Sequence, residues 1–161
     1  YEADKVWPVA GGEAAQGTSG VIEVVGSTEN AIGYADASAV GQLSTAAIGV
    51  GDEFVSFSPE AAAKVVDASE PADTGVEGDL ALELARDTTE SGAYPIVLVS
   101  YHIVCTNYSD AAQGELVKDF IGYVISEEGQ TASAEAAGSA PISADLRAQA
   151  EESLAGITTG K

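Results

Sequence analysis

The stretch Ala93–Cys105, AYPIVLVSYHIVC, decides the expected fold. Between Ile96 and Val104 the residues are apolar and often β-branched at both alternating positions, and Pro95 stands at the entrance. A run of this kind predicts a central β-strand whose two faces are covered by helices. A shorter stretch, NAIGYADAS at Asn30–Ser38, predicts a strand over Ala31–Tyr34 that passes at once into a polar segment, read as a weak helix or a loop. Together they indicate an α/β protein.

Further strands are expected on either side of these stretches. Leucines alternate with small or charged residues over Leu80–Leu84, which predicts a half-buried strand. Ala46–Val50 is a short apolar run, and Lys5–Ala10 reads as the end of a strand closed by Pro8. The polar and acidic segment Asp67–Asp79 predicts a surface loop.

The clearest helix start is SPEAAAKVV. Ser58 is the expected N-cap, Pro59 stands at the first helical position, and Glu60 favours the positive end of the helix dipole. The alanines that follow predict a helix to about Asp67.

The longest helix is expected to begin at Ser109 or Asp110 and to end before Gly129 as its C-cap. Apolar residues recur there at spacings of three and four, which gives one broad stripe: Leu116, Val117, Phe120, Ile121, Val124 and Ile125.

Softer signals predict three more helices. One covers Val21–Val25, with Thr18 or Ser19 as N-cap and Gly26 as its end. A second lies in TASAEAAGSAPIS and is followed by a loop. The last begins after Ser143 and runs from Ala144 to about Leu154.

The charge of the chain limits its partners. The 161 residues carry 26 acidic and 6 basic side chains, a formal net charge of -20. Such a surface repels nucleic acid and anionic membranes over a Debye length of about 8 Å at physiological salt, so no nucleic-acid partner is expected. No apolar run reaches the roughly 20 residues that span a bilayer. Because the chain opens on Tyr1, we expect a processed chain or a piece of a longer one.

No set of residues predicts catalysis or a metal site. His102, the one histidine, lies in an apolar run and is interpreted as a structural residue, with a general base as the alternative. Cys105 is read either as a small buried apolar residue or as half of a disulfide to a cysteine outside this chain. The loop GGEAAQGTSG, Gly11–Gly20, is a tight connection or an anion-binding helix start. Catalytic and metal-binding residues are therefore predicted as none, and no cofactor is expected.

The order of two blocks resembles the phosphate-binding proteins of ABC transporters. The first block, VWPVAGGEAAQGTSGVIEVV followed by NAIGYADAS, is similar to the Trp-Pro, glycine-rich loop, helix and Gly-Ala-Ile-Gly-Tyr order of that family, with Asn30 where the family usually has Gly. The second block begins with AYPIVLVSYHIVC and continues through GELVKDFIGYVI and SEEGQ to SAPISADLRAQA. The resemblance covers nearly the whole chain.

The resemblance implies a type 2 periplasmic-binding-protein-like, two-lobed architecture of which only the C-terminal part is present. Residues 1–92 would be the remainder of the second lobe and residues 93–161 the C-terminal part of the first lobe. The implied function is that of a non-enzymatic extracytoplasmic protein, which captures inorganic phosphate and delivers it to an ABC permease. It would reside in the cell envelope, lipid-anchored through an N-terminal part outside this chain, or in the periplasm.

The chain departs from the family in its ligand motifs. The family's Thr-Phe stretch, its Ser and Asp of the first lobe, and its Arg followed by Ser-Gly-Thr do not occur here, so no ligand residue is carried over. The expected partners are phosphate bound through the N-terminal part, the permease, and an N-terminal fragment or a second copy that covers exposed strands. Two alternatives stay open: a surface interaction or adhesion domain of the same fold, and a hydrolase that depends on His102.

Overall fold

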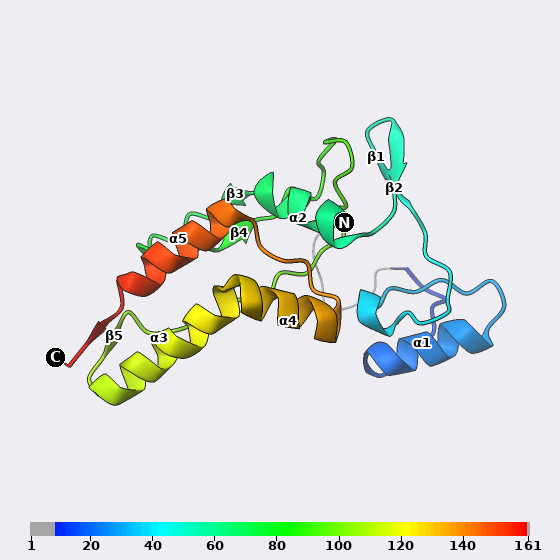
Figure 1. Cartoon of the computed structure of the whole chain (residues 1–161). Coiled ribbons are helices and arrows are strands. Elements are labelled where there is room, and N and C mark those ends of the chain that lie inside the picture. Colours follow the sequence, from blue (N-terminus) through cyan, green and yellow to red (C-terminus); the bar gives the residue numbers. More distant parts are fainter. Residues whose placement is uncertain (1–8, 161) are drawn as a thin grey trace. The chain divides into compact units, whose positions relative to one another are not determined.

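The computed structural model describes residues 9–160 (Figure 1). Internal contacts divide the chain into two units, residues 1–44 and residues 45–161. The lobe boundaries expected from the sequence, residues 1–92 and 93–161, remain a prediction. Most of the strand end expected at Lys5–Ala10 lies outside the described residues. Its last two residues, Val9 and Ala10, are described and belong to no strand.

The first unit contains helix α1, Gly17–Ser27, and a short 3-10 helix η1, Ala37–Ala39. The predicted helix is confirmed but is longer than expected. It begins after Gln16, so Thr18 and Ser19 lie in its first turn instead of capping it, and Gly26 lies inside its last turn.

The strand expected at Ala31–Tyr34 is wrong, because no regular structure covers these residues. Ile32 is 87% exposed, and the described residues of this unit contain no strand that could pair with the stretch. Gly33 instead passes close to α1. A Cβ atom there would lie 2.9 Å from Val25 Cγ2 and 3.0 Å from Val21 Cγ1, so only glycine fits without displacing a valine.

The second unit begins with an antiparallel hairpin and a helix. Strands β1, Ile48–Val50, and β2, Glu53–Val55, pair with each other, and helix α2, Pro59–Asp67, follows. The predicted cap is confirmed, since Ser58 Oγ accepts a hydrogen bond of 3.1 Å from the Ala61 amide. The small core of this region combines residues of the hairpin and the helix with two partly buried neighbours: Val50, Val55, Ala61, Ile48 and Tyr94.

The strand expected at Leu80–Leu84 is confirmed only in part. Strand β4 covers Leu82–Glu83 and pairs antiparallel with β3, Glu70–Pro71. Apart from β3, the segment Asp67–Asp79 is largely exposed turn and loop beyond the end of α2, as expected.

The C-terminal part is mainly helical. Helices α3, Ala111–Ile125, α4, Glu127–Ala137, and α5, Ala144–Ala155, follow one another, and α3 packs beside α5 (Figure 1). Strand β5, Asn107–Tyr108, precedes α3 and pairs in parallel with β6, Thr158–Thr159, which follows α5. Among the described residues, none of the helices has the length and apolar character needed to cross a membrane.

The helix starts follow the sequence closely. Asp110 caps α3 by accepting from the amides of Ala112 and Gln113, and Ser143 caps α5 by accepting from the Leu146 amide. The expected C-cap at Gly129 is wrong, because α3 ends at Ile125 and Gly129 lies in the first turn of α4.

A single residue joins α3 to α4. Ser126 Oγ donates a hydrogen bond of 2.7 Å to the Tyr123 carbonyl and accepts one of 3.1 Å from the Gly129 amide. Ser126 is therefore the C-cap of one helix and the N-cap of the next. A Cβ atom at Gly129 would overlap the Tyr123 carbonyl oxygen, so this corner requires glycine.

Gln130 fixes the same corner from the other side. Its Nε2 donates 2.8 Å to the Val124 carbonyl at the end of α3, and its Oε1 accepts 2.9 Å from the Ile142 amide before α5. Arg147 of α5 adds an ion pair of 2.9 Å to Glu127 of α4. The last three helices are thus linked by side-chain contacts as well as by sequence.

The central strand expected at Ile96–Val104 is wrong. Figure 1 draws the chain between β4 and β5 as coil, and no strand is assigned to these residues. A strand exists only where its backbone groups meet those of a neighbour. Within residues 9–160, no neighbouring strand makes a backbone-to-backbone hydrogen bond with this run.

Candidate functional site

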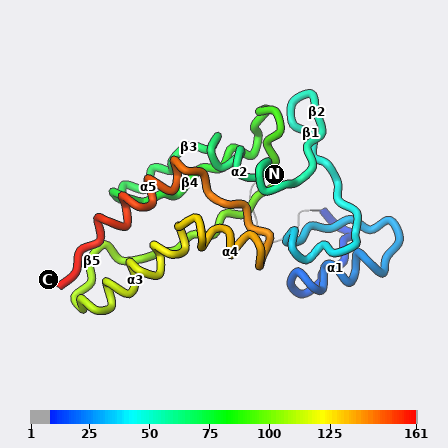
Figure 2. The backbone as a smooth tube through the Cα atoms, in the orientation of Figure 1, coloured from blue at the N-terminus to red at the C-terminus, as the bar shows by residue number. Residues whose placement is uncertain are grey.

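The region with the most unusual surface is Ile96–Val104, called here the apolar segment. In Figure 2 its backbone is part of the extended green trace that leads to β5. Leu98 is 92% exposed and Ile103 is 95% exposed. Exposed apolar side chains gathered in one segment commonly mark a surface that binds another molecule or another part of a protein.

The entrance to the apolar segment is held firmly on the hairpin and on α2. Ala93 is fully buried, and the Tyr94 amide donates 2.9 Å to the Ala61 carbonyl. The Tyr94 ring meets Phe57 edge to face with 6.4 Å between the ring centroids. The start of the run is therefore fixed even though the run itself is exposed.

Two charged side chains secure the turn just before Ala93. Glu53 Oε1 accepts 2.7 Å from the Gly92 amide, and Lys64 Nζ donates 3.0 Å to the Ser91 carbonyl. The hydrogen bond from Gly92, followed by one from Ser91, lowers the pKa of the Glu53 carboxyl below its ordinary value.

The first half of the segment keeps the alternation of an extended chain. Val97 and Val99 are half-buried, whereas Ile96, Leu98 and Ser100 are exposed. This period of two is the pattern of a strand that covers a core with one face. The sequence therefore sets the direction of the side chains even where no ladder forms.

Arg86 occupies the edge of this half. Its Nη1 donates 3.2 Å to the Pro95 carbonyl and its Nη2 donates 3.1 Å to the Val97 carbonyl. In Tyr101 the side chain belongs to the segment itself, and its hydroxyl accepts a hydrogen bond of 3.1 Å from the Leu82 amide of β4. Side chains thus make contacts that backbone groups make in a sheet.

The opposite edge is free in the part of the chain that the structure describes. No hydrogen bond there involves the backbone groups of Ile96, Leu98 or Ser100. In an extended chain, alternate residues point their N–H and C=O groups to the same side. These residues therefore form an edge that could pair with a further strand.

The far end of the segment rests on α3 and β5. The His102 ring meets Phe120 edge to face with 6.1 Å between centroids. The Cys105 amide donates 3.0 Å to the Tyr108 hydroxyl. Both ends of the run are anchored, and the exposed residues lie between them.

The two reactive residues singled out in the sequence make no catalytic contacts in the part of the chain that the structure describes. His102 is exposed and its ring contacts Phe120, so its interpretation as a structural residue stays a prediction. Among residues 9–160, no hydrogen bond joins its ring to a nucleophile or carboxylate, as a general base requires. Cys105 is a free, exposed thiol, so its reading as a buried apolar residue is wrong. Both residues are exposed because, in the part of the chain that the structure describes, no strand pairs with this run.

Two further predictions concern metal ligands and the glycine-rich loop. Over the described ranges, no group of three or more His, Cys, Asp or Glu side chains could hold a metal ion. In the loop Gly11–Gly20, α1 begins at Gly17 and Gln16 makes no capping side-chain hydrogen bond. The prediction that the chain carries no phosphate ligand has no test here and stays a prediction.

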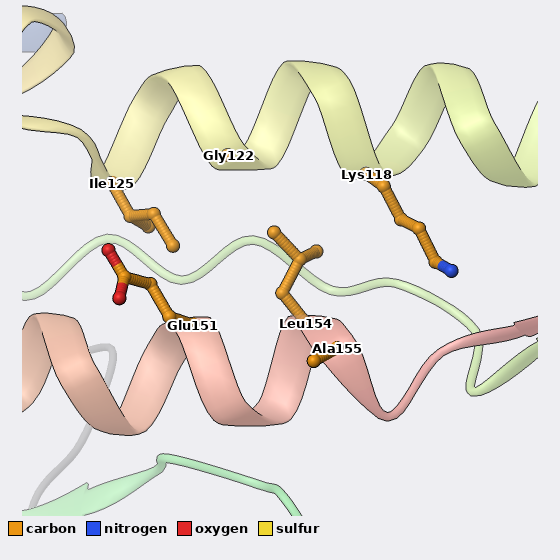
Figure 3. A pocket seen from close by; sticks show the side chains of 6 residues that line it. All are labelled: Lys118, Gly122, Ile125, Glu151, Leu154 and Ala155. Atoms are coloured by element: carbon orange, nitrogen blue, oxygen red, sulfur yellow. The ribbon is translucent and has the colours of Figure 1, made fainter.

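A hollow of about 320 Å³ lies between α3 and α5. In Figure 3, Ile125 of α3 and Leu154 of α5 point into it, with Glu151 beside Ile125 and Lys118 at the other end. Its lining is mostly apolar, and Gly122 and Ala155 leave it open. Of the apolar stripe expected on α3, Ile125 is the member that lines this hollow, so the stripe did not predict it.

Sequence reasoning missed Arg86 and Tyr101, which hold the apolar segment in place. Both act on residues nine or more positions away, Arg86 on Pro95 and Val97 and Tyr101 on Leu82. The amino-acid sequence next to either residue contains no pattern that predicts such a contact.

Comparison with known proteins identifies relatives of the chain. A family profile described as a PBP superfamily domain matches residues 2–128. Phosphate-binding protein PstS 3 of Mycobacterium leprae (strain TN) is 35% identical over 116 residues, which cover 68% of this chain and 31% of that protein. Phosphate-binding proteins PstS2 of Mycobacterium bovis (strain BCG / Pasteur 1173P2) and PstS 2 of Mycobacterium tuberculosis (strain ATCC 25618 / H37Rv) are each 34% identical over the same length and shares. The match thus spans about a third of these relatives, and no solved structure matches the chain.

Proposed function

Since the chain belongs to the PBP superfamily, we propose that it is the C-terminal part of an extracytoplasmic protein that captures inorganic phosphate for an ABC permease. The observation that carries this proposal is the 35% identity to a phosphate-binding protein over 116 residues. The mechanism would be closure of two lobes around the anion, a hinge-type change between an open and a closed state.

The acidity of the chain is compatible with anion capture. Phosphate enclosed between lobes is bound by short N–H and O–H donors, whose effect is local. Exposed carboxylates farther than about 8 Å away are screened at physiological salt. A net charge of -20 therefore lowers the rate of encounter with phosphate more than it weakens the closed complex.

The direct test is calorimetric titration with inorganic phosphate of the intact protein that contains this chain, in parallel with the 161-residue chain alone. We expect saturable binding by the intact protein and none by the chain alone, because the family's ligand motifs do not occur in it. Absence of heat from the intact protein at millimolar phosphate, with sulfate and molybdate equally silent, would overturn the proposal. Binding of another oxyanion in place of phosphate would correct the ligand only.

We also propose that the apolar segment is covered by the rest of the same protein, or by a second copy when that part is absent. The support is the free edge at Ile96, Leu98 and Ser100 together with the exposure of Leu98 and Ile103. Pairing along that edge would satisfy the backbone groups and cover the outward side chains in one step.

Light scattering of the chain, alone and mixed with the separately expressed remainder of the protein, tests this covering. Leu98→Lys places a charge in the segment, and Leu116→Lys is the matched control at an exposed leucine of α3. We expect wild type and Leu116→Lys to associate and Leu98→Lys to stay monomeric. A wild-type chain that remains monomeric and fails to bind the remainder would refute the covering, whatever the outcome of the phosphate titration.

A role in binding is favoured over catalysis by the named relatives, which are phosphate-binding proteins. The hydrolase alternative has no support from the surroundings of His102, where the described contact is with the Phe120 ring. Replacing His102 by Ala is therefore expected to leave phosphate binding by the intact protein unchanged.

A further inference from the structure

We draw no further inference here: the strongest candidate, the mostly apolar hollow between α3 and α5, is an unpartnered surface, and nothing in the described residues shows what covers it.

Discussion

The apolar segment and helix α3 have similar amino-acid composition but different secondary structure. Both are rich in Val, Ile and aromatic residues, yet α3, Ala111–Ile125, begins after Asp110 as predicted, whereas the segment forms no strand. A helix closes its hydrogen bonds between residues four apart, so its partners are always in the same sequence. A strand needs a second strand, and within residues 9–160 the segment has none. Neighbouring residues therefore determine whether a helix forms, whereas a strand also depends on a partner strand from a distant part of the sequence.

Burial alone does not explain this contrast. Leu116 of α3 is 68% exposed, and Phe120 is exposed as well. The apolar stripe of the helix is therefore covered only in part, chiefly where Val117, Ile121 and Val124 are half-buried. The helix keeps its structure without full burial because its backbone is already satisfied.

The largest effect is expected at the corner between α3 and α4. Gly129→Ala should lower the free energy of unfolding by about 3 kcal/mol, because the new methyl group overlaps the Tyr123 carbonyl and the backbone must move. Gly122→Ala is the control, since its Cβ would lie 3.7 Å from Leu154 Cδ2, an ordinary contact, and alanine favours the helix. Urea denaturation measures both. Equal effects of the two substitutions would show that the corner does not depend on glycine.

The next effect compares one buried and one exposed apolar residue. Val65→Ala should cost about 2 kcal/mol, because Val65 is fully buried in α2 and the substitution leaves a cavity. Leu98→Ala should change stability by less than about 0.5 kcal/mol, since its side chain is exposed. Thermal unfolding of dilute monomer tests the pair. A large loss for Leu98→Ala in that sample would mean that the segment is packed within the chain.

A smaller effect is expected where a side chain replaces a sheet contact. Tyr101→Phe removes the hydroxyl that accepts from the Leu82 amide, which should cost about 1 kcal/mol and speed hydrogen exchange at Leu82. The amide of Ala72, which donates to the Ala81 carbonyl, serves as an internal reference that should keep its rate. An unchanged exchange rate at the Leu82 amide would show that the hydrogen bond to Tyr101 does not hold the segment against β4.

The smallest effect is a pH dependence at the entrance to the segment. Because hydrogen bonds lower the folded pKa of Glu53, its contribution to stability is present above the ordinary glutamate pKa of about 4.3 and is lost as the pH falls through the lowered value. Glu53→Gln should therefore flatten the stability curve slightly at acidic pH. Glu77→Gln, an exposed loop substitution, is the comparison variant, because it removes a carboxylate and leaves the Glu53–Gly92 hydrogen bond in place. Identical slopes for all three proteins would rule out a contribution from Glu53.

The same contrast between helices and strands explains which elements could be predicted from the sequence. Caps and helices were predictable because their signals are short-range: Ser58 before α2, Asp110 before α3 and Ser143 before α5 all act as expected. The larger errors fall on the strands at Ala31–Tyr34 and Ile96–Val104, whose β-rich composition indicates a preference for strand but not a partner. Smaller errors concern the caps expected at Thr18 or Ser19 and at Gly129.

The candidate site could be predicted only in outline. The run Ile96–Val104 could be recognised as apolar, and its exposure was expected from the resemblance to a larger fold. The attachment of that run by Arg86 could not be foreseen, because a guanidinium that bonds two carbonyls nine and eleven residues away leaves no periodic trace in the sequence.

The shared hydroxyl of Ser126 has a consequence for how this chain can vary in length. Ser126 has an extended backbone between the two helices, and its one hydroxyl bridges the Tyr123 carbonyl and the Gly129 amide. One added residue at that position would separate these two groups and displace Gln130 from Val124 and Ile142. Insertions should thus be tolerated in the turn after Gly138 and selected against at Ser126, so the spacing between α3 and α4 is a property that related sequences would be expected to keep fixed.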